Sequence, residues 1–202
     1  PDREMPDREM PDQQGAKQMQ IIAGQKRGAK LATVQGQSVR PTAQRTRESL
    51  FNILQGGKHI DDLQDLIVLD LFAGSGALGL EALSRGSAKS YFVEKSPEAI
   101  AIIKQNARKL GVEAQARVVQ GDCLTHSRWM YAPANLVFCD PPYDKGLALD
   151  ALANFKKIGA FADDALIVIE ARKNEVFSFG DEYTLLDERR YGMAAVYFLR
   201  FA

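Results

Sequence analysis

The chain has 202 residues, of which 46% are hydrophobic and 26% are charged, and its formal net charge is zero. These values are typical of one soluble globular domain with a small extension. No apolar stretch approaches the roughly 18 residues that would span a bilayer, and no signal-peptide pattern opens the chain, so we expect a cytoplasmic protein. Cys123 and Cys139 lack a Cys-x-x-Cys spacing, and only two histidines are present, so no metal site is expected.

Charge is unevenly distributed along the chain. The sequence begins with a doubled Pro-Asp-Arg-Glu-Met repeat, and we predict a disordered leader over residues 1–18. Residues 15–58 carry eight basic residues and one acid, a net charge of +7, whereas residues 59–202 carry a net charge of −4. A basic segment joined to a mildly acidic body indicates an arm that binds a polyanion, although an ordinary solvated surface has the same pattern.

The basic segment, residues 19–58, is predicted to form a small extension. Met19–Ala23 and Lys30–Val34 are β-prone and flank a glycine-containing basic turn, so they predict a β-hairpin. A helix is expected to start at Pro41-Thr42, with Thr42 as its N-cap, and to end at Gly56-Gly57.

Residues 59–202 are predicted to form the main domain, in which strands and helices alternate. Near-continuous apolar strands in such an alternation indicate a parallel sheet that is covered on both faces and doubly wound. The expected strands are 66–72, 90–94, 116–120, 136–140 and 165–170; the expected helices are 76–85, 97–110, a short stretch at 124–131, and 147–158.

The end of the chain departs from this alternation. Residues 183–186 and 194–201 are β-prone and flank a turn predicted at 188–192, so an antiparallel hairpin closes the chain. The predicted fold is therefore α/β, with a mostly parallel, doubly wound sheet of seven strands.

A glycine-rich loop follows the first strand of the main domain. Gly74 and Gly76 allow a tight turn and a close approach of a ligand to the backbone, and Gly79 permits close packing of the helix on the sheet. Glu94 follows Gly74 by 20 residues and ends the second strand. This spacing suits the ribose of a dinucleotide or of S-adenosylmethionine, and the loop alone does not distinguish the two cofactors.

Acidic residues stand at the ends of three successive strands. Asp70 precedes the glycine loop, Glu94 ends the second strand, and Asp122 follows the third strand, next to Cys123. A carboxylate at Asp70 is poorly placed beside a pyrophosphate, so the three acids favour a cationic cofactor without phosphates. Each acid alone could equally be a helix cap or a solvated loop residue.

The most informative segment is Asp140-Pro141-Pro142-Tyr143, which follows the buried strand at 136–140. The prolines make a stiff turn whose carbonyl groups are free to accept hydrogen bonds. A carboxylate, these carbonyl groups and the flat ring of Tyr143 together suit a planar ring that bears an exocyclic amino group. A rigid turn with a half-buried tyrosine is the alternative.

With these residues the chain resembles the class I S-adenosylmethionine-dependent methyltransferases of Rossmann-like fold. More narrowly, it resembles the bacterial family that methylates N2 of a guanine in 16S ribosomal RNA. The glycine loop marks only the superfamily, whereas the block formed by Arg40-Pro41-Thr42 and Arg47-Glu48-Ser49-Leu50-Phe51-Asn52 is far more specific.

The resemblance implies a role for each matching position. The cofactor would be S-adenosylmethionine, with Glu94 at its ribose, Asp122 and Cys123 at its adenine, and Thr42 near its methionine end; Asp70, Phe72, Gly74 and Gly76 would also line it. Asp140, Pro141 and Tyr143 would receive the target base. The basic extension would contact RNA phosphates through Lys26, Arg27, Lys30, Arg40, Arg45 and Arg47.

Several alternatives stay open at this level. Asp-Pro-Pro-Tyr also suits methylation of adenine N6 in a nucleic acid or of a glutamine in a protein. A nicotinamide-dependent oxidoreductase and a non-catalytic RNA-binding protein are further possibilities. The expected partner is 16S rRNA within an assembled or assembling small ribosomal subunit, with no membrane partner, and the expected state is a monomer.

Overall fold

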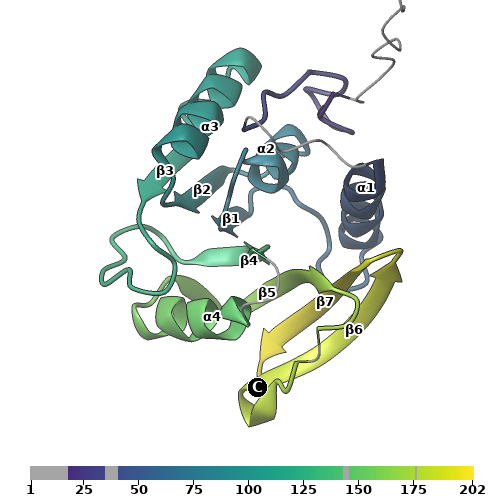
Figure 1. The fold of residues 1–202 in the computed structure, drawn as a ribbon, viewed down its shortest axis with the longest axis vertical. Coiled ribbons are helices and arrows are strands. Elements are labelled where there is room, and N and C mark those ends of the chain that lie inside the picture. The colour runs from purple at the N-terminus through teal and green to yellow at the C-terminus, as the bar shows by residue number, and fades with distance from the viewer. Residues whose placement is uncertain (1–17, 35–40, 143–145, 176) are drawn as a thin grey trace, which may run out of the picture.

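A computed structural model describes residues 18–34, 41–142, 146–175 and 177–202. Figure 1 shows a single sheet with helices on both sides, and the C-terminal strands form one edge of it. The leader that was predicted to be disordered, residues 1–18, lies outside the described residues except for residue 18. No helix in the described part of the chain has both the length and the apolar character needed to cross a membrane.

The sheet has seven strands in the order β3-β2-β1-β4-β5-β7-β6. Neighbouring pairs from β3 to β5 are parallel, and β7 joins β5 and β6 in antiparallel pairs, so the predicted fold class is confirmed. The strands are β1 (Ile67–Leu71), β2 (Lys89–Glu94), β3 (Ala116–Gln120), β4 (Ala134–Cys139), β5 (Phe161–Arg172), β6 (Tyr183–Tyr191) and β7 (Ala194–Phe201).

The helices divide between the two faces of the sheet. They are α1 (Pro41–Gln55), α2 (Ala77–Ser84), α3 (Pro97–Leu110) and α4 (Leu147–Lys157), with a 3₁₀ turn at Gly180–Glu182. In Figure 1, α4 lies on the side of the sheet opposite to α2 and α3. Local sequence defines α3 clearly, because the Ser96 hydroxyl accepts the Ala99 N–H at its start and Gly111, at φ 67°, ends it.

Alternation along the strands explains this division. Phe138 and Val168 face one side of the sheet, where Phe51 of α1 packs on Phe138 with ring centroids 5.6 Å apart. Val137 and Ile167 face the other side and pack against Phe155 of α4. Both faces are buried, which is why the strands are almost continuously apolar.

The first part of the amino-terminal extension, residues 19–34, packs closely on α2. It forms the predicted reversal but only one antiparallel bridge, Gln20 to Lys30. Glu81 of α2, which is fully buried, accepts the backbone N–H groups of Ile22 and Ala23 at 2.8 and 3.0 Å. Gly24 lies against the end of α2, where a Cβ would approach the Ser84 carbonyl oxygen to 1.9 Å. The extension is therefore part of the folded body.

Two predicted elements are wrong. Residues 124–131 form no helix, because the Asn154 amide of α4 donates to the carbonyl oxygens of Cys123 and His126, and Trp129 packs edge-on against Tyr91. The predicted turn at 188–192 belongs largely to β6, which runs to Tyr191, and the chain reverses at Gly192-Met193. Long-range aromatic packing and strand pairing decide both segments.

Candidate active site

A pocket of about 510 Å³ lies at the carboxyl edge of the parallel strands. It occupies the point where the strand order reverses, between β1 and β4, which is the usual ligand position in a doubly wound sheet. Its walls are the glycine loop, the ends of β1, β2, β4 and β5, and the turn at 140–142. One cavity therefore joins most of the predicted cofactor residues to two of the predicted target residues, Asp140 and Pro141. Gly76 is not in its lining, and a Cβ there would meet Ile103 and Phe92.

The glycine loop is shaped for a close ligand. Gly74 and Gly76 have φ angles of 54° and 78°, and a Cβ at Gly74 would meet no heavy atom closer than the Phe72 carbonyl oxygen at 4.0 Å. Phe72, which also lines the pocket, has φ 58°, an uncommon conformation for a bulky residue. At Gly79 a Cβ would lie 2.4 Å from Cε1 of Phe92, which confirms the predicted close packing of helix on sheet.

Glu94 fixes the loop from the end of β2. One of its carboxylate oxygens accepts the Gly74 N–H at 2.8 Å, and the other accepts the N–H groups of Lys95 and Ser96 at 2.9 and 2.8 Å. The carboxylate lines the pocket with acceptor capacity remaining, since a carboxylate has about four lone-pair positions.

Asp122 and Cys123 form the wall beyond β3. Asp122 accepts the Leu124 N–H at 2.9 Å and pairs with Lys95 at 3.0 Å, and these contacts lower its pKa. The Cys123 thiol is buried, which raises its pKa to about 12. This cysteine is therefore a neutral, apolar wall residue at neutral pH.

Asp70 lies at the floor of the pocket. It is 2% exposed and accepts the Gly79 N–H at 3.0 Å. Burial raises its pKa to about 8, and the neighbouring Glu94 adds to the effect. The residue thus holds the start of α2 against β1 as well as facing the cavity.

Asp140 and Pro141 lie at the end of β4 and face the same cavity. The Asp140 carboxyl has a pKa well above its ordinary value, because of burial and of the nearby carboxyl groups of Glu170 and Asp70. Pro141 is buried and Pro142 is exposed, and both line the pocket. Tyr143 lies outside the described residues.

Glu170 and Arg47 also line this pocket, in places that the sequence interpretation did not predict. Glu170 extends from β5, beside the end of β4, and burial raises its pKa to about 7 while Arg47 opposes the rise. Arg47 is one turn before Phe51 on the buried face of α1, is 6% exposed, and donates to the Gln20 carbonyl oxygen at 2.8 Å. An acid at the end of a fifth strand was the available signal for Glu170.

The other predicted basic residues lie elsewhere. Arg27, Lys30 and Arg45 are exposed and Lys26 is half-buried. Arg47 differs from them because it is 6% exposed and lines the pocket, and its predicted contact with RNA phosphates stays a prediction. Arg40 lies outside the described residues.

The predicted role of Thr42 as the helix N-cap is wrong. Helix α1 begins at Pro41, so Thr42 lies within the first turn and is not the N-cap. Its side chain is outside the described part of the structure, and its predicted contact with the cofactor stays a prediction. Among the described residues, no group of three or more His, Cys, Asp and Glu residues could hold a metal ion.

The fold and the site together define a class I S-adenosylmethionine-dependent methyltransferase. The sheet ends in the antiparallel strands β7 and β6, the glycine loop follows β1, and acidic residues line the pocket at five strand ends. The chain belongs to the family described as conserved hypothetical protein 95, whose sequence pattern matches residues 19–200.

Named relatives fall in the same class. "Ribosomal RNA small subunit methyltransferase D" of Escherichia coli (strain K12) is 39% identical over 157 residues, which cover 78% of this chain and 76% of the relative. The protein of the same name from Haemophilus influenzae is 34% identical over 184 residues, covering 88% and 91% of the two chains. The solved structure of "Putative methyltransferase yhhF" from Escherichia coli has a TM-score of 0.77 at 35% identity and covers 92% of this chain and 98% of its own.

Proposed function

We propose that this protein transfers a methyl group from S-adenosylmethionine to the exocyclic N2 of a guanine in 16S rRNA. The observation that carries the proposal is the single cavity shared by the glycine loop and by Asp140-Pro141. The names of the relatives support small-subunit rRNA as the substrate. The guanine N2 target comes from the resemblance of the upstream block around Arg47-Glu48.

The charge of the pocket favours a sulfonium cofactor over a dinucleotide. Its lining carries five acids and two bases: Asp70, Glu94, Asp122, Asp140 and Glu170 against Arg47 and Lys95. A pyrophosphate would meet repulsion there, whereas a cation is stabilised by nearby carboxylates. The open backbone at Gly74 leaves room for the ligand, and Glu94 and Asp122, which line the pocket, would accept hydrogen bonds from ribose hydroxyls and from an adenine amino group.

When bound, S-adenosylmethionine supplies an electrophilic methyl group on a positively charged sulfur. This positive charge favours the ionised form of the nearby carboxyl groups, whose pKa values are raised in the free protein. Asp140 would therefore be a carboxylate, and so a hydrogen-bond acceptor, when the cofactor is in place.

The target amine would be held by two acceptors. The Asp140 carboxylate and the Pro141 carbonyl group accept its two N–H hydrogens, which orients the nitrogen lone pair toward the methyl group. In-line transfer forms the N–C bond as the S–C bond breaks, and correct orientation of reactants contributes about 7–11 kcal/mol. The nitrogen becomes positively charged, so Asp140 stabilises that charge until the amine proton leaves.

The basic surface would engage the RNA outside the pocket. Lys26, Arg27, Lys30 and Arg45 would contact phosphates, which gives a salt-dependent affinity. The guanine must be unpaired or flipped out to reach Asp140. We further propose that the substrate is rRNA in a small ribosomal subunit, assembled or assembling, and that the protein acts in the cytoplasm as a monomer.

The test is to offer tritiated S-adenosylmethionine with naked 16S rRNA, small subunits that lack the modification, DNA and a glutamine-containing peptide. We expect label in rRNA, recovered as N2-methylguanosine after nuclease digestion. Label in N6-methyladenosine or in the peptide would replace the proposed target. No transfer to any acceptor, with rRNA binding retained, would favour a non-catalytic RNA-binding protein.

A further inference from the structure

Glu170 lines the active-site pocket, and the reaction proposed above gives it no contact with the target base. It lies near the end of β5, which pairs in parallel with β4 up to Ile169 and Cys139. Asp140 and Glu170 are therefore the next residues of two adjacent strands, which lie about 4.8 Å apart. After burial itself, the charge of Glu170 is the main cause of the raised pKa of Asp140. The two carboxyl groups are thus near neighbours in one pocket.

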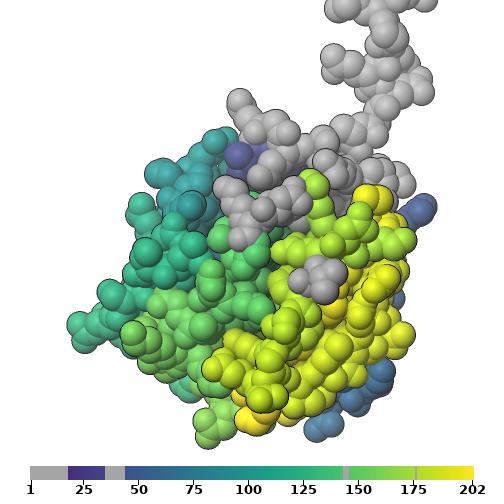
Figure 2. Space-filling model, turned by 60° about the horizontal axis from the view of Figure 1, so that its bottom comes forward, coloured from purple at the N-terminus to yellow at the C-terminus, as the bar shows by residue number. Residues whose placement is uncertain are grey.

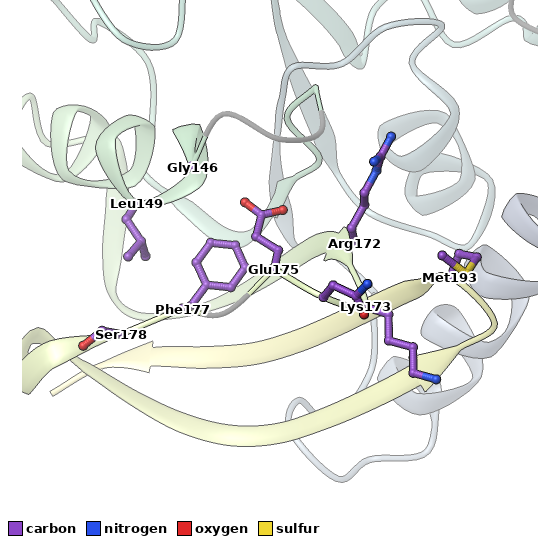
Figure 3. A pocket seen from close by; sticks show the side chains of 9 residues that line it. Gly146, Leu149, Arg172, Lys173, Glu175, Phe177, Ser178 and Met193 are labelled. Carbon is purple, nitrogen blue, oxygen red and sulfur yellow. The ribbon is translucent and has the colours of Figure 1, made fainter.

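The remainder of β5 adds no second charged group to this pocket. In the space-filling view, the green surface of the α4 region directly adjoins the yellow-green surface that follows β5, so the segments after β4 and β5 stay neighbours (Figure 2). A separate hollow of about 470 Å³ lies around the end of β5. Figure 3 shows the side chains of Arg172 and Lys173 extending from its wall in different directions, so they form no joint site. Among the described residues, Glu170 is the β5 residue that lines the active-site pocket.

The carboxyl group of Glu170 is open to a ligand. The residue is half-buried at the pocket wall. Burial raises its pKa and the charge of Arg47 opposes the rise, and no hydrogen bond from a described residue is among the causes. A cofactor cation in the same pocket would favour the ionised form further. Glu170 would then be a carboxylate whose lone pairs can accept hydrogen bonds from a base.

Arg47 adds a hydrogen-bond donor to the same wall. It lines the pocket and is 6% exposed, and its charge acts on Glu170. One terminal nitrogen donates to the Gln20 carbonyl oxygen, whereas the buried Nε has no hydrogen-bond partner among the described residues. A buried donor without an acceptor is costly, so an acceptor atom on a bound base would stabilise the guanidinium.

An acceptor and a donor beside Asp140 match one edge of guanine. Next to the N2 amino group, guanine has the N1–H donor on one side and the N3 acceptor on the other, and O6 follows N1 as an acceptor. With N2 held at Asp140, the Glu170 carboxylate would repel N3 and accept the N1–H. Adenine has the reverse pattern, since its N1 is an acceptor and its 6-amino group is a donor. A flipped base is read by hydrogen bonds to this edge.

We propose that Glu170 and Arg47 select guanine as the target base, Glu170 by accepting its N1–H and Arg47 by donating to its O6. The inference rests on the proposed function, because it requires a purine amino group at Asp140. It assigns base selection to two residues at the acceptor end of the pocket, whereas orientation of the reacting amine stays with Asp140 and Pro141.

The test uses small subunits whose 16S rRNA carries either guanine or 2-aminopurine at the position that the protein methylates. 2-Aminopurine keeps the amino group that would receive the methyl group and lacks both N1–H and O6. The measurement is the ratio of kcat/KM for the two bases, in which changes in the folded fraction or in cofactor binding cancel. The wild type should prefer guanine by about 100-fold, because 2-aminopurine leaves Glu170 and Arg47 without their partners.

Two variants separate the two contacts. The amide in Glu170→Gln can accept from the N1–H of guanine or donate to the bare N1 of 2-aminopurine, so the preference should fall to about fivefold. Arg47→Lys keeps the cation and removes Nε, so the preference should fall about threefold. Glu113→Gln and Arg45→Lys make the same changes at exposed positions and should keep the wild-type preference.

Three results would overturn these assignments. A wild type that methylates both bases equally would show that N1–H and O6 are not read. A Glu170→Gln preference equal to that of Glu113→Gln, with guanine methylated by the wild type, would reject the role of Glu170 and leave the proposed function standing; equal preferences for Arg47→Lys and Arg45→Lys would reject the contact of Arg47 with O6. If the wild type transfers no methyl group to rRNA, both proposals fail.

Discussion

The two sides of the active-site pocket hold their carboxyl groups in different ways. On the glycine-loop side, the Glu94 carboxylate accepts three backbone N–H groups, and contacts with Leu124 N–H and Lys95 lower the pKa of Asp122. On the opposite side, the carboxyl groups of Asp140 and Glu170 lie near each other, and burial raises the pKa of each. Asp122 on the first side stays ionised, whereas the ionisation of Asp140 and Glu170, and of Asp70 with its pKa of about 8, depends on what is bound.

This difference matches the two tasks of a methyltransferase. A cofactor is held best by groups whose charge and position are settled before it arrives. Under the proposed function, the acceptor side, with Asp140 and Glu170, would instead respond to a cation next to it and then to a proton released by the amine. Arg47, the buried cation of the acceptor side, limits the cost of placing these carboxyl groups together.

The largest expected effect on the stability of the fold comes from removing the Arg47 cation. Arg47→Met should destabilise the fold by about 3 kcal/mol, because it leaves Glu170 without its nearby cation and the Gln20 carbonyl group without its donor. The loss should be smaller at pH 6 than at pH 8, since Glu170, with a pKa of about 7, is more protonated at the lower pH. Urea unfolding at the two pH values measures it.

The exposed Arg45 on the same helix provides the control, and Arg45→Met should change stability by no more than about 0.5 kcal/mol. Equal stabilities for the two variants would show that Arg47 is not a structural counter-ion.

A medium effect is expected from Glu170→Gln. The pKa of Glu170 rises from 4.5 to about 7 on folding, so the native state binds more protons than the unfolded state between these pH values. Stability should therefore fall as pH rises from about 4.5 to 7 and level off above, by about 1–3 kcal/mol from this group. The glutamine variant should lose this component of the pH dependence.

Chemical denaturation across pH 4.5–8 tests the prediction. Asp164→Asn, an exposed acid on the same strand, should leave the wild-type curve unchanged. A Glu170→Gln curve that is parallel to wild type throughout would contradict the raised pKa of Glu170.

The smallest effect on stability is expected on the glycine-loop side. Gly74→Ala should cost about 1–2 kcal/mol, since alanine is strained at φ 54°. The added methyl group would point into open space in the pocket wall, so cofactor affinity should fall about tenfold. Calorimetry with S-adenosylhomocysteine measures the affinity, and unaltered binding would show that the loop does not approach the cofactor.

Local patterns in the sequence predicted most of the fold. Apolar runs located the five parallel strands, and α3 runs over Pro97–Leu110, the range that the sequence predicted. The prediction of a helix at 124–131 was wrong, because the path of this segment is determined by the Asn154 amide and by the ring of Tyr91, both distant in sequence. The division at residue 58 stays a prediction, and Glu81 binds the extension tightly to α2.

The sequence predicted the pocket residues on the glycine-loop side. On the side of Asp140 it missed Glu170 and the place of Arg47 in the pocket lining. Gly74, Glu94 and Asp140 stand at strand ends, where sequence position alone indicates a shared edge. Arg47 was predicted only as a contact for RNA phosphates, because charge counts do not reveal which face of α1 is buried. Arg47 precedes Phe51 by four residues, so the two share one face of α1. Only the packing of Phe51 on Phe138 shows that this face covers the sheet.

The most direct test of the account is methyl transfer in a single turnover by Asp140→Ala with cofactor already bound. We expect a rate about 100- to 1,000-fold below wild type, with S-adenosylhomocysteine affinity within about threefold of wild type. Asp150→Ala, an exposed acid on α4, should retain the wild-type rate. A wild-type rate in Asp140→Ala, or a loss of rate explained by lost cofactor binding, would contradict the role of Asp140 in holding the target amine.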